Sequence, residues 1–473
     1  MCSGPDWNAL QGEISGDVIL PGSPHYETAR RPAIMRFHNL RPRAVVLCET
    51  PADVSETIRF ARRSGLRTAT RSGRHCFAGR SLTEGIVIDV RPMRSVSVSG
   101  GVATVGAGAR LGEVYDALEK HGVTIPAGCG PSVGISGLTL GGGLGILGRK
   151  HGLTSDHLLG ARIVLADGSV VDCDEHHHED LFWALRGAGG SNFGGVTSLV
   201  FGTIPAPAAT AFHLTWRLTH AATVIDAWQR SAPTAPDELA ASLLMTATGD
   251  VEKPPVANVF GAMLGTESDT AEQLDELVAR VGANPASAFH KQMSYRETKR
   301  YLAELGDAMA SEDDRLGEGS NDEPQGHPYS KSEFFRRPLP TEAIAALVDD
   351  FVEGRRAGQS RELDFTPWGG AYNRVPAEAT AFVHRDELFL LQHAVVVDPD
   401  ASTTAREDAR RWLARWWASV HRWGSGGVYP NFPDPDLTNW KHAYHVTNHE
   451  RLVRVKIKYD PDDFFRFRQS PPG

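Results

Sequence analysis

Short apolar runs alternate with helical patterns along the first half of the chain. The run RAVVLCE (43–49) predicts a strand. The next four residues, 50–53, form a helix start, with Thr as N-cap, Pro at the first helical position and a carboxylate in the first turn. This helix should end at Gly65, and strands at 68–72 and 85–90 should follow it. The pattern predicts a small α+β unit.

A second unit of the same kind follows. A strand at 103–109 precedes a helix over 111–118, whose apolar residues fall at helical spacing. The stretch 161–174 contains two apolar runs joined by Asp-Gly, which predicts a hairpin. A helix at 179–185 and a strand at 196–201 complete the unit. We therefore expect residues 1–206 to form one domain, with a core at about 39–206.

Glycine becomes less frequent near Ile204-Pro205-Ala206-Pro207, and longer helical patterns appear after it. We place a domain boundary there. Residues 207–425 mix strand and helix patterns, and the polar stretch 311–330 predicts a surface loop. The predicted fold class is α+β.

Composition narrows the range of functions. The 49 Lys and Arg against 58 Asp and Glu give a net charge of −9, which argues against a surface for nucleic acid or a membrane. No run of 18 apolar residues and no signal-peptide layout are visible, so we expect a cytoplasmic protein. The five cysteines include no CxxC pair, so the sequence suggests neither a disulfide framework nor a cysteine zinc site.

Two polar or glycine-rich segments each have two interpretations. The glycines of 134–145 could hold a phosphate with backbone N–H groups or form a structural turn. The run Asp174–Asp180, which includes His176, His177 and His178, contains metal-ligand side chains, and a metal-dependent hydrolase is one alternative. Consecutive side chains of an extended chain point in opposite directions, which favours a solvated loop and no metal site.

His75 lies in RSGRHCFAG (71–79), directly after a predicted strand. Loops at strand ends are common positions for reactive groups. This loop, the segment PAGCGPSVGISGLTLGGGLGILGRKHGLTSDHLL, the segment DLFWALRGAGGSNFGGVTSLVF and the C-terminal YPNFPDPDLTNWKHAY together resemble the berberine bridge enzyme-like FAD-linked oxidases, within the vanillyl-alcohol-oxidase-like superfamily. The resemblance covers most of the chain.

The resemblance implies a PCMH-type FAD-binding domain of two α+β subdomains and a substrate domain with an antiparallel sheet flanked by helices. Residues 426–473 would return to the flavin. His75 would bind the flavin 8α-methyl group covalently. The other residues implied to bind FAD are Arg71, Ser72, Gly73, Arg74, Cys76, Gly79, Gly128, Val133, Gly134, Gly137, Leu138, Gly141, Gly142, Gly143, Gly152, Leu153, Asp156, Val196 and Asn431.

Three positions depart from the family pattern. Arg74 replaces a glycine, so its guanidinium would reach the pyrophosphate or the loop would take another path. Cys129 is the candidate for a second covalent bond, at flavin C6, but it lies one place before the family's cysteine, so we expect attachment through His75 with no obligatory second bond. Phe432 replaces a frequent tyrosine.

The resemblance also implies the chemistry. Tyr429 would take the hydroxyl proton as hydride leaves the substrate carbon for the flavin, or would only position the substrate. Gln392 would orient the substrate, and Val133 lies where the family controls oxygen access. The expected function is an oxidase that acts on a CH–OH or similar CH–X carbon of a sugar, an alcohol or a secondary metabolite and passes electrons to O₂, giving hydrogen peroxide. A dehydrogenase or biosynthetic tailoring enzyme with another acceptor is the alternative.

Overall fold

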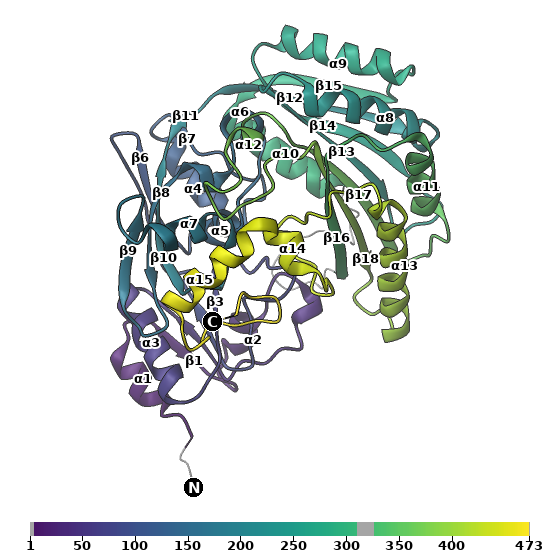
Figure 1. Cartoon of the computed structure of the whole chain (residues 1–473). Helices are drawn as coiled ribbons and strands as arrows, with labels where there is room; N and C mark the ends of the chain where they lie inside the picture. The colour runs from purple at the N-terminus through teal and green to yellow at the C-terminus, as the bar shows by residue number, and fades with distance from the viewer. Residues whose placement is uncertain (1–3, 310–325, 473) are drawn as a thin grey trace.

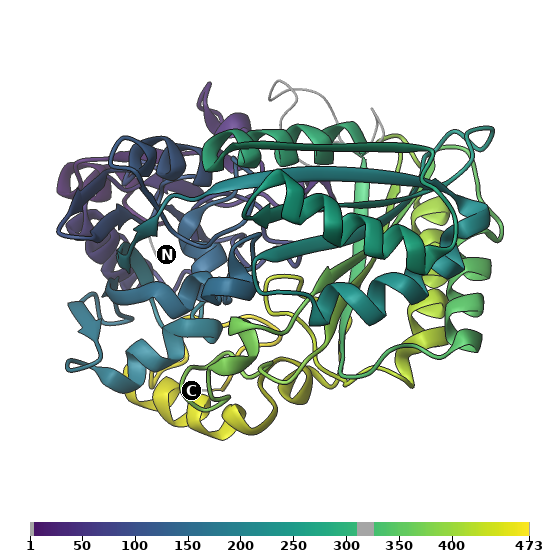
Figure 2. The ribbon, with the colours of Figure 1, turned by 90° about the horizontal axis from the view of Figure 1, so that it is seen from above.

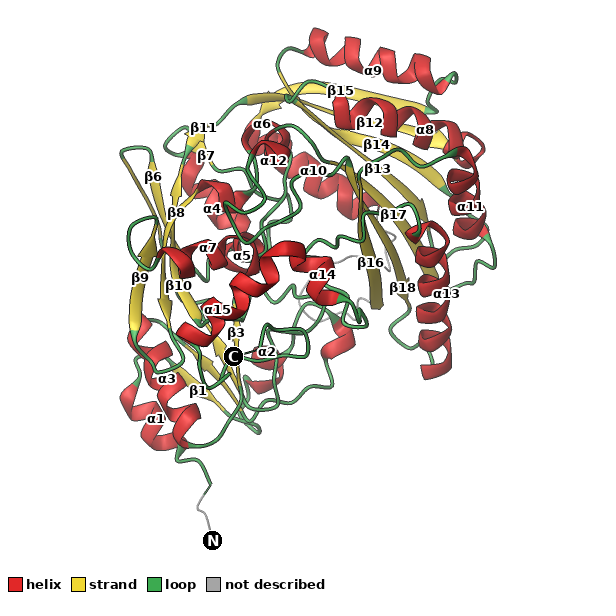
Figure 3. Cartoon of the chain, viewed as in Figure 1, coloured by secondary structure: helices red, strands yellow, loops and turns green. Residues whose placement is uncertain are grey.

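The computed structural model describes residues 4–309 and 326–472. Most strands form three sheets of four, five and seven strands, and helices lie between and around them (Figure 1). Figure 3 shows helices and strands in every part of the described chain. The predicted α+β class is confirmed.

The N-terminal sheet has the strand order β1-β2-β4-β3. Its strands are β1 (Asp17–Ile19), β2 (Ala44–Leu47), β3 (Thr68–Arg71) and β4 (Ile86–Asp89). The parallel strands β2 and β3 are connected through α3 (Pro51–Arg63), as parallel strands require a crossover. Thr50 Oγ1 accepts the Asp53 N–H at 3.2 Å and the Asp53 carboxylate accepts the Thr50 N–H at 3.1 Å, so the predicted helix start is confirmed.

The second sheet is antiparallel, with the order β5-β6-β10-β8-β9. Its strands are β5 (Val96–Ser99), β6 (Val102–Gly106), β8 (Leu158–Val164), β9 (Val170–Asp174) and β10 (Gly195–Gly202). The predicted hairpin is the pair β8 and β9, and Gly168 in its turn has φ +82°. Helices α4 (Leu111–Glu119) and α7 (Glu179–Ala188) contribute apolar residues to the core that both N-terminal sheets share.

The third sheet is antiparallel and has the order β15-β12-β14-β13-β17-β18-β16. Its strands are β12 (Ala208–Arg217), β13 (Leu239–Ala247), β14 (Val256–Leu264), β15 (Ser287–Ser294), β16 (His327–Phe335), β17 (Gln359–Pro367) and β18 (Phe389–Val397). One face packs against α8 (Ala221–Ser231), α9 (Glu267–Val281), α11 (Thr341–Val352) and α13 (Thr403–His421). Figure 2 shows these helices outside the sheet, and α10 (Tyr295–Met309) contacts α4 on the other side.

The sheet begins at Ala208, directly after the proposed domain boundary, which itself stays a prediction. Residues 311–325 of the predicted surface loop 311–330 lie outside the described residues. From His327 the prediction is wrong, because 327–330 pair with β18 as the start of β16. Backbone pairing thus overrides a polar composition.

The C-terminal segment crosses from the third sheet back to the N-terminal half (Figure 1). Its helices are α14 (Trp440–His445) and α15 (His449–Tyr459), and α15 packs against α7. The remaining short elements are α1 (Trp7–Glu13), α2 (Tyr26–Arg30), η1 (Met35–Phe37), β7 (Val123–Thr124), α5 (Ile135–Leu140), α6 (Gly148–His151), η2 (Thr154–His157), β11 (Ile204–Pro205), η3 (Leu218–His220), η4 (Ala232–Thr234), α12 (Ala371–Arg374) and η5 (Val446–Asn448). Among the described residues, no helix has the length and apolar character needed to span a membrane.

Lys456 on α15 anchors this segment. It is fully buried, and its ammonium donates to Asn192 O at 2.8 Å, Asp460 Oδ2 at 2.6 Å and Phe465 O at 2.5 Å. Lys458 on the same helix pairs with Asp180 at 2.8 Å, but its side chain is 59% exposed.

We expect Lys456→Met to destabilise the protein far more than Lys458→Met. The first substitution leaves the buried Asp460 carboxylate unpaired, which typically costs about 3–5 kcal/mol. The second removes an exposed ion pair, which contributes about 0–1 kcal/mol. Urea denaturation of both variants measures the difference. Equal shifts of the two midpoints would contradict the anchoring role of Lys456.

Candidate cofactor-binding site

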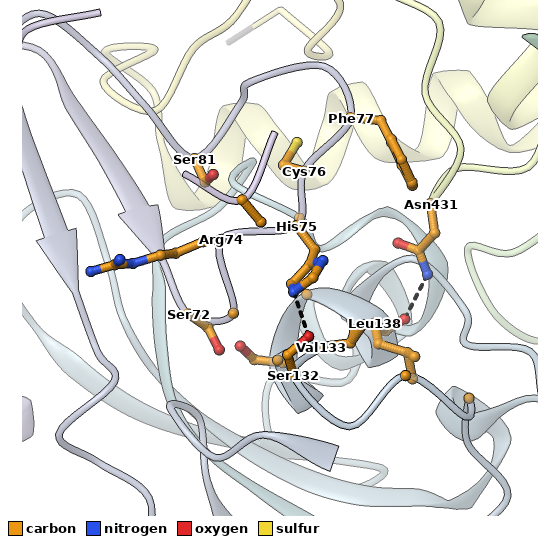
Figure 4. Close-up of a pocket in the computed structure, with 18 of the residues that line it drawn as sticks. Ser72, Arg74, His75, Cys76, Phe77, Ser81, Ser132, Val133, Leu138 and Asn431 are labelled. Carbon is orange, nitrogen blue, oxygen red and sulfur yellow. Dashed lines mark hydrogen bonds between the residues drawn. The ribbon is translucent and has the colours of Figure 1, made fainter. Parts of the chain in front are cut away.

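A cavity of about 580 Å³ lies where several distant parts of the chain meet. The loop after β3, the segment 128–138 that includes most of α5, the end of α10 and the segment 429–433 all line it. Figure 4 shows His75, Ser132, Leu138 and Asn431 around this space. Residues far apart in the sequence therefore form one site.

Two glycines bring the first two of these loops into contact. A Cβ on Gly73 would lie 2.1 Å from Gly134 N, and a Cβ on Gly134 would lie 2.4 Å from Gly73 N. No side chain fits at either position, so the two backbones touch only because both residues are glycine. This contact fixes the loop of His75 against the segment of Ser132.

Arg74 and Arg71 anchor the His75 loop to the neighbouring elements α2 and β4. Arg74 has φ +69°, a conformation that favours glycine. Glycine is the residue that the family pattern has at this position. Its guanidinium donates to Thr28 O at 3.1 Å and Ala29 O at 3.3 Å, so the structure engages this group with protein carbonyls. The buried Arg71 pairs with Asp89 at 2.7 Å. Both arginines are among the residues that line the cavity, and their contacts anchor the loop.

His75 is half-buried in the cavity wall, and its Nε2 lies 3.0 Å from Ser132 Oγ. Burial, together with the nearby Arg110 cation, lowers the pKa of His75 to about 4. The imidazole is therefore neutral at physiological pH, and one of its two nitrogens carries a free lone pair. A neutral imidazole can act as a nucleophile. Ser132 was not among the residues singled out from the sequence.

Cys129 also lines the cavity and is half-buried. Its Sγ lies 3.7 Å from the ammonium of Lys299 on α10. Lys299 is buried, and its ammonium also donates to Ala127 O at 2.5 Å and Gly128 O at 3.2 Å. The Cys129 sulfur is thus in contact with the amino group of Lys299, whose pKa is lowered by burial. No local sequence signal marks Lys299, because α10 reaches this loop only through the tertiary fold.

The phenol of Tyr429 is buried at the cavity wall and accepts three hydrogen bonds. Gly143 N, Leu144 N and Asn431 Nδ2 each lie 3.1 Å from its oxygen. Asn431 also donates to Leu138 O at 2.8 Å. Burial raises the pKa of Tyr429 to about 12, although the three donors would stabilise a phenolate.

The structure divides the residues that the resemblance assigned to FAD into two groups. Those that line the cavity are Arg71, Ser72, Gly73, Arg74, His75, Cys76, Gly128, Cys129, Val133, Gly134, Gly137, Leu138, Val196 and Asn431. Those absent from its lining are Gly79, Gly141, Gly142, Gly143, Gly152, Leu153 and Asp156. Within the glycine-rich segment, Gly134 and Gly137 thus line the cavity, whereas Gly141, Gly142 and Gly143 do not.

The second group has structural explanations. Gly142, Gly143 and Gly152 have φ of +112°, +84° and +92°, which only glycine adopts readily. A Cβ on Gly141 would lie 2.1 Å from Asn431 Oδ1. Gly141, Gly142 and Gly143 belong to the turn that donates to Tyr429, whereas Gly152 ends α6.

The other three members of that group also contact protein atoms. Asp156 accepts the Leu153 N–H at 2.9 Å and pairs with Arg385 at 2.6 Å. Gly79 has φ +69°, and a Cβ there would lie 2.9 Å from the Phe37 ring.

Gln392 lies on β18, outside the cavity lining, and faces the side of the sheet on which Tyr429 packs. Leu390, two residues before it, shares a buried cluster with Tyr429, and alternate strand residues share a face. Asp364 on β17 is directly opposite Gln392 and so lies on the same face. Asp364 Oδ1 is buried without a hydrogen-bond partner among the described residues, and burial raises the pKa of Asp364 to about 7.

The histidine run 176–178 follows β9 at the surface. The His177 side chain is 73% exposed, and its Nδ1 lies 3.0 Å from Asp174 Oδ1. Asp180 pairs instead with Lys458 and Tyr459 of α15. Within residues 4–309 and 326–472, no three His, Cys, Asp or Glu side chains form a group that could hold a metal ion.

The cavity has the features that FAD requires. Its volume lies in the range of about 300–1,000 Å³ that is usual for ligand sites. Glycines 73, 134 and 137 line the cavity, and their backbone suits a pyrophosphate, which needs N–H donors. Val133, Leu138 and Phe432 provide apolar surface for a flat ring. The residues present therefore fit this cofactor.

Comparison with known proteins agrees with this site. The FAD binding domain family matches residues 42–174, and the berberine and berberine-like family matches residues 428–472. An uncharacterised FAD-linked oxidoreductase of Bacillus subtilis (strain 168) is 31% identical over 470 residues, which cover 97% of each chain. Berberine bridge enzyme-like 18 of Arabidopsis thaliana is 31% identical over 459 residues, covering 91% of this chain and 83% of that protein.

Solved structures show the same arrangement over almost the whole chain. The BBE-like 1 protein of Physcomitrella patens superposes with a TM-score of 0.86 at 28% identity and 98% coverage of both chains. Chitooligosaccharide oxidase superposes with a TM-score of 0.84 at 27% identity, again over 98% of both chains. The chain therefore belongs to the berberine bridge enzyme-like family of FAD-linked oxidoreductases.

Proposed function

We propose that this FAD-dependent oxidoreductase is an oxidase with its flavin bound covalently to His75. It removes a hydride from a CH–OH or similar CH–X carbon of a sugar, alcohol or secondary metabolite and passes the electrons to O₂, which gives hydrogen peroxide. The observation that carries this proposal is the position of His75, in contact with Ser132, in the wall of a cavity that fits FAD. Relatives named chitooligosaccharide oxidase and, from Berberis wilsoniae, tetrahydroberberine oxidase support small-molecule oxidation.

The loops of Gly73 and Gly134 would hold the pyrophosphate through backbone N–H groups. Val133 and Leu138 would pack on the ring, and Val133 would leave room for oxygen. When bound, FAD supplies the hydride acceptor, and a histidyl bond makes it a stronger one. We propose attachment through His75 with no obligatory second bond, because Cys129 lies one place before the family's cysteine.

Tyr429 is the proposed acceptor of the substrate hydroxyl proton. Its oxygen faces three N–H donors, which stabilise negative charge on the phenol. With a pKa of about 12, Tyr429 can act as a base only as the phenolate, so it must first lose its own proton to solvent before it takes one from the substrate. Gln392 has no titratable group and would orient the substrate.

Asp364 is the second candidate for the proton acceptor. It shares the sheet face of Gln392, and its pKa of about 7 places it near the optimum for a general base at neutral pH. Because a base acts in its ionised form, this role predicts a rate that rises with pH up to about 7 and is then constant. Separate substitution of Tyr429 and of Asp364 shows which of the two accepts the proton.

A direct test of the oxidase proposal uses oxygen itself. The protein is reduced anaerobically with a panel of sugars and alcohols, and its reoxidation is followed by stopped-flow absorbance after mixing with O₂. We expect rapid reoxidation with one hydrogen peroxide formed per flavin. Slow reoxidation that an artificial electron acceptor accelerates would show a dehydrogenase instead.

We expect the yellow colour of the purified protein to stay with the pellet after acid precipitation, because the flavin is covalently bound. His75→Ala should release all of its FAD into the supernatant, whereas Cys129→Ala should keep its flavin in the pellet. Absorbance at the flavin maximum in both fractions measures this. Acid-resistant flavin in His75→Ala, or its loss in Cys129→Ala, would refute attachment through His75 alone.

Tyr429→Phe should slow flavin reduction by about a hundred- to ten-thousand-fold, the usual effect of removing a general base. Flavin content and reoxidation by O₂ should not change, because the ring packing is preserved. Rates are measured by anaerobic stopped-flow across pH 5 to 9. The opposite outcome has two parts: Asp364→Asn abolishes flavin reduction and with it the rise of the rate up to about pH 7, while Tyr429→Phe reduces its flavin within a few-fold of the unmodified rate. Asp364 is then the base, and Tyr429 only positions the substrate.

A further inference from the structure

Ser132 is the hydrogen-bonding partner of His75 in the cavity wall. Its Oγ lies 3.0 Å from His75 Nε2, and both residues are half-buried. Figure 4 shows the other ring nitrogen, Nδ1, turned away from Ser132 toward the side where Phe77 and Asn431 lie. Ser132 thus occupies one nitrogen of the imidazole and leaves the other facing the space that fits FAD.

The backbone on both sides of Ser132 is fixed. Pro131 O accepts the Gly112 N–H at 2.9 Å and Val133 O accepts the Leu111 N–H at 2.9 Å, so the start of α4 holds both neighbours. The contact between Gly73 and Gly134 fixes the His75 loop to the same segment. The distance between Ser132 Oγ and His75 Nε2 is therefore set by the fold, not by a mobile side chain alone.

The protonation of His75 defines what Ser132 does. A neutral imidazole carries one proton, and only the nitrogen without it has a lone pair for a new bond. If Nδ1 forms the bond, the proton is on Nε2, and Ser132 Oγ must accept it. The ring becomes positively charged as the bond forms, and a hydrogen bond to a charged group is stronger than one between neutral groups.

We propose that Ser132 is a positioning residue for flavin attachment: its hydroxyl accepts the Nε2–H of His75 and so presents the Nδ1 lone pair to the 8α-methyl carbon of FAD. This inference rests on the proposed covalent bond to His75.

In this step the methyl carbon loses a proton and Nδ1 forms the C–N bond. The imidazole then loses its Nε2 proton, which leaves along the hydrogen bond to Ser132. The ring system of the cofactor takes up two electrons and two protons. Dioxygen is the co-reactant that removes them again as hydrogen peroxide, which restores the oxidised cofactor on His75.

The test compares Ser132→Ala with Ser132→Thr, which keeps the hydroxyl. Each holoprotein is purified, incubated in air with added FAD and sampled over time, and acid precipitation separates covalent from released flavin. Total bound flavin is measured before precipitation. We expect normal total FAD in both variants, and covalent attachment in Ser132→Ala about ten- to a hundred-fold slower than in Ser132→Thr, as expected for loss of a hydrogen bond to a charged group. Nuclear magnetic resonance of the flavin peptide should show substitution at Nδ1.

Attachment in Ser132→Ala at the rate of Ser132→Thr would overturn the role of Ser132, as would substitution at Nε2. Loss of total FAD in Ser132→Ala would also overturn it, because Ser132 would then serve binding and not attachment. These outcomes are distinct from failure of the proposed function, in which the unmodified protein lacks acid-resistant flavin or His75→Ala retains it.

Discussion

The backbone contact between Gly73 and Gly134 is the constraint on which the site depends. A single Cβ at Gly73 would lie 2.1 Å from a backbone nitrogen, so the two loops can meet only without side chains. Their contact places His75 next to Ser132 and forms one wall of the cavity. The strained backbone of Arg74 and the buried pair of Arg71 with Asp89 hold the same loop from the other side. A rigid loop is what a covalent cofactor bond needs.

The C-terminal segment closes the site from the opposite direction. Tyr429 accepts N–H groups of the turn 141–144, which lies nearly three hundred residues earlier in the chain. Buried Lys456 holds the later part of the segment on the N-terminal half. Because Leu390 of the third sheet packs in one cluster with Tyr429, the sheet face that carries Gln392 and Asp364 lies on the side of Tyr429. Cofactor cavity and sheet face thus adjoin each other through Tyr429.

Local signals in the sequence predict local structure well. The capping residues Thr50 and Asp53 start α3, and the Asp-Gly pair in 161–174 forms the hairpin of β8 and β9, because both depend on neighbouring residues. The contact of Ser132 with His75, the approach of Lys299 to Cys129 and the register that places Asp364 opposite Gln392 depend on tertiary packing and strand pairing. The resemblance located the cavity residues, but only the structure separates glycines at the cavity from glycines that support Tyr429.

Peptide mapping of the flavin tests the central claim most directly. Trypsin cleaves after Arg74 and Arg80, so His75 lies in the short peptide 75–80, whereas Cys129 lies in the peptide 121–149. Mass spectrometry of the yellow fraction identifies the peptide that carries the flavin. We expect the flavin mass on peptide 75–80, on its histidine, and on no other peptide. Flavin on peptide 121–149, a flavin that links both peptides, or no flavin peptide at all would contradict attachment through His75 alone.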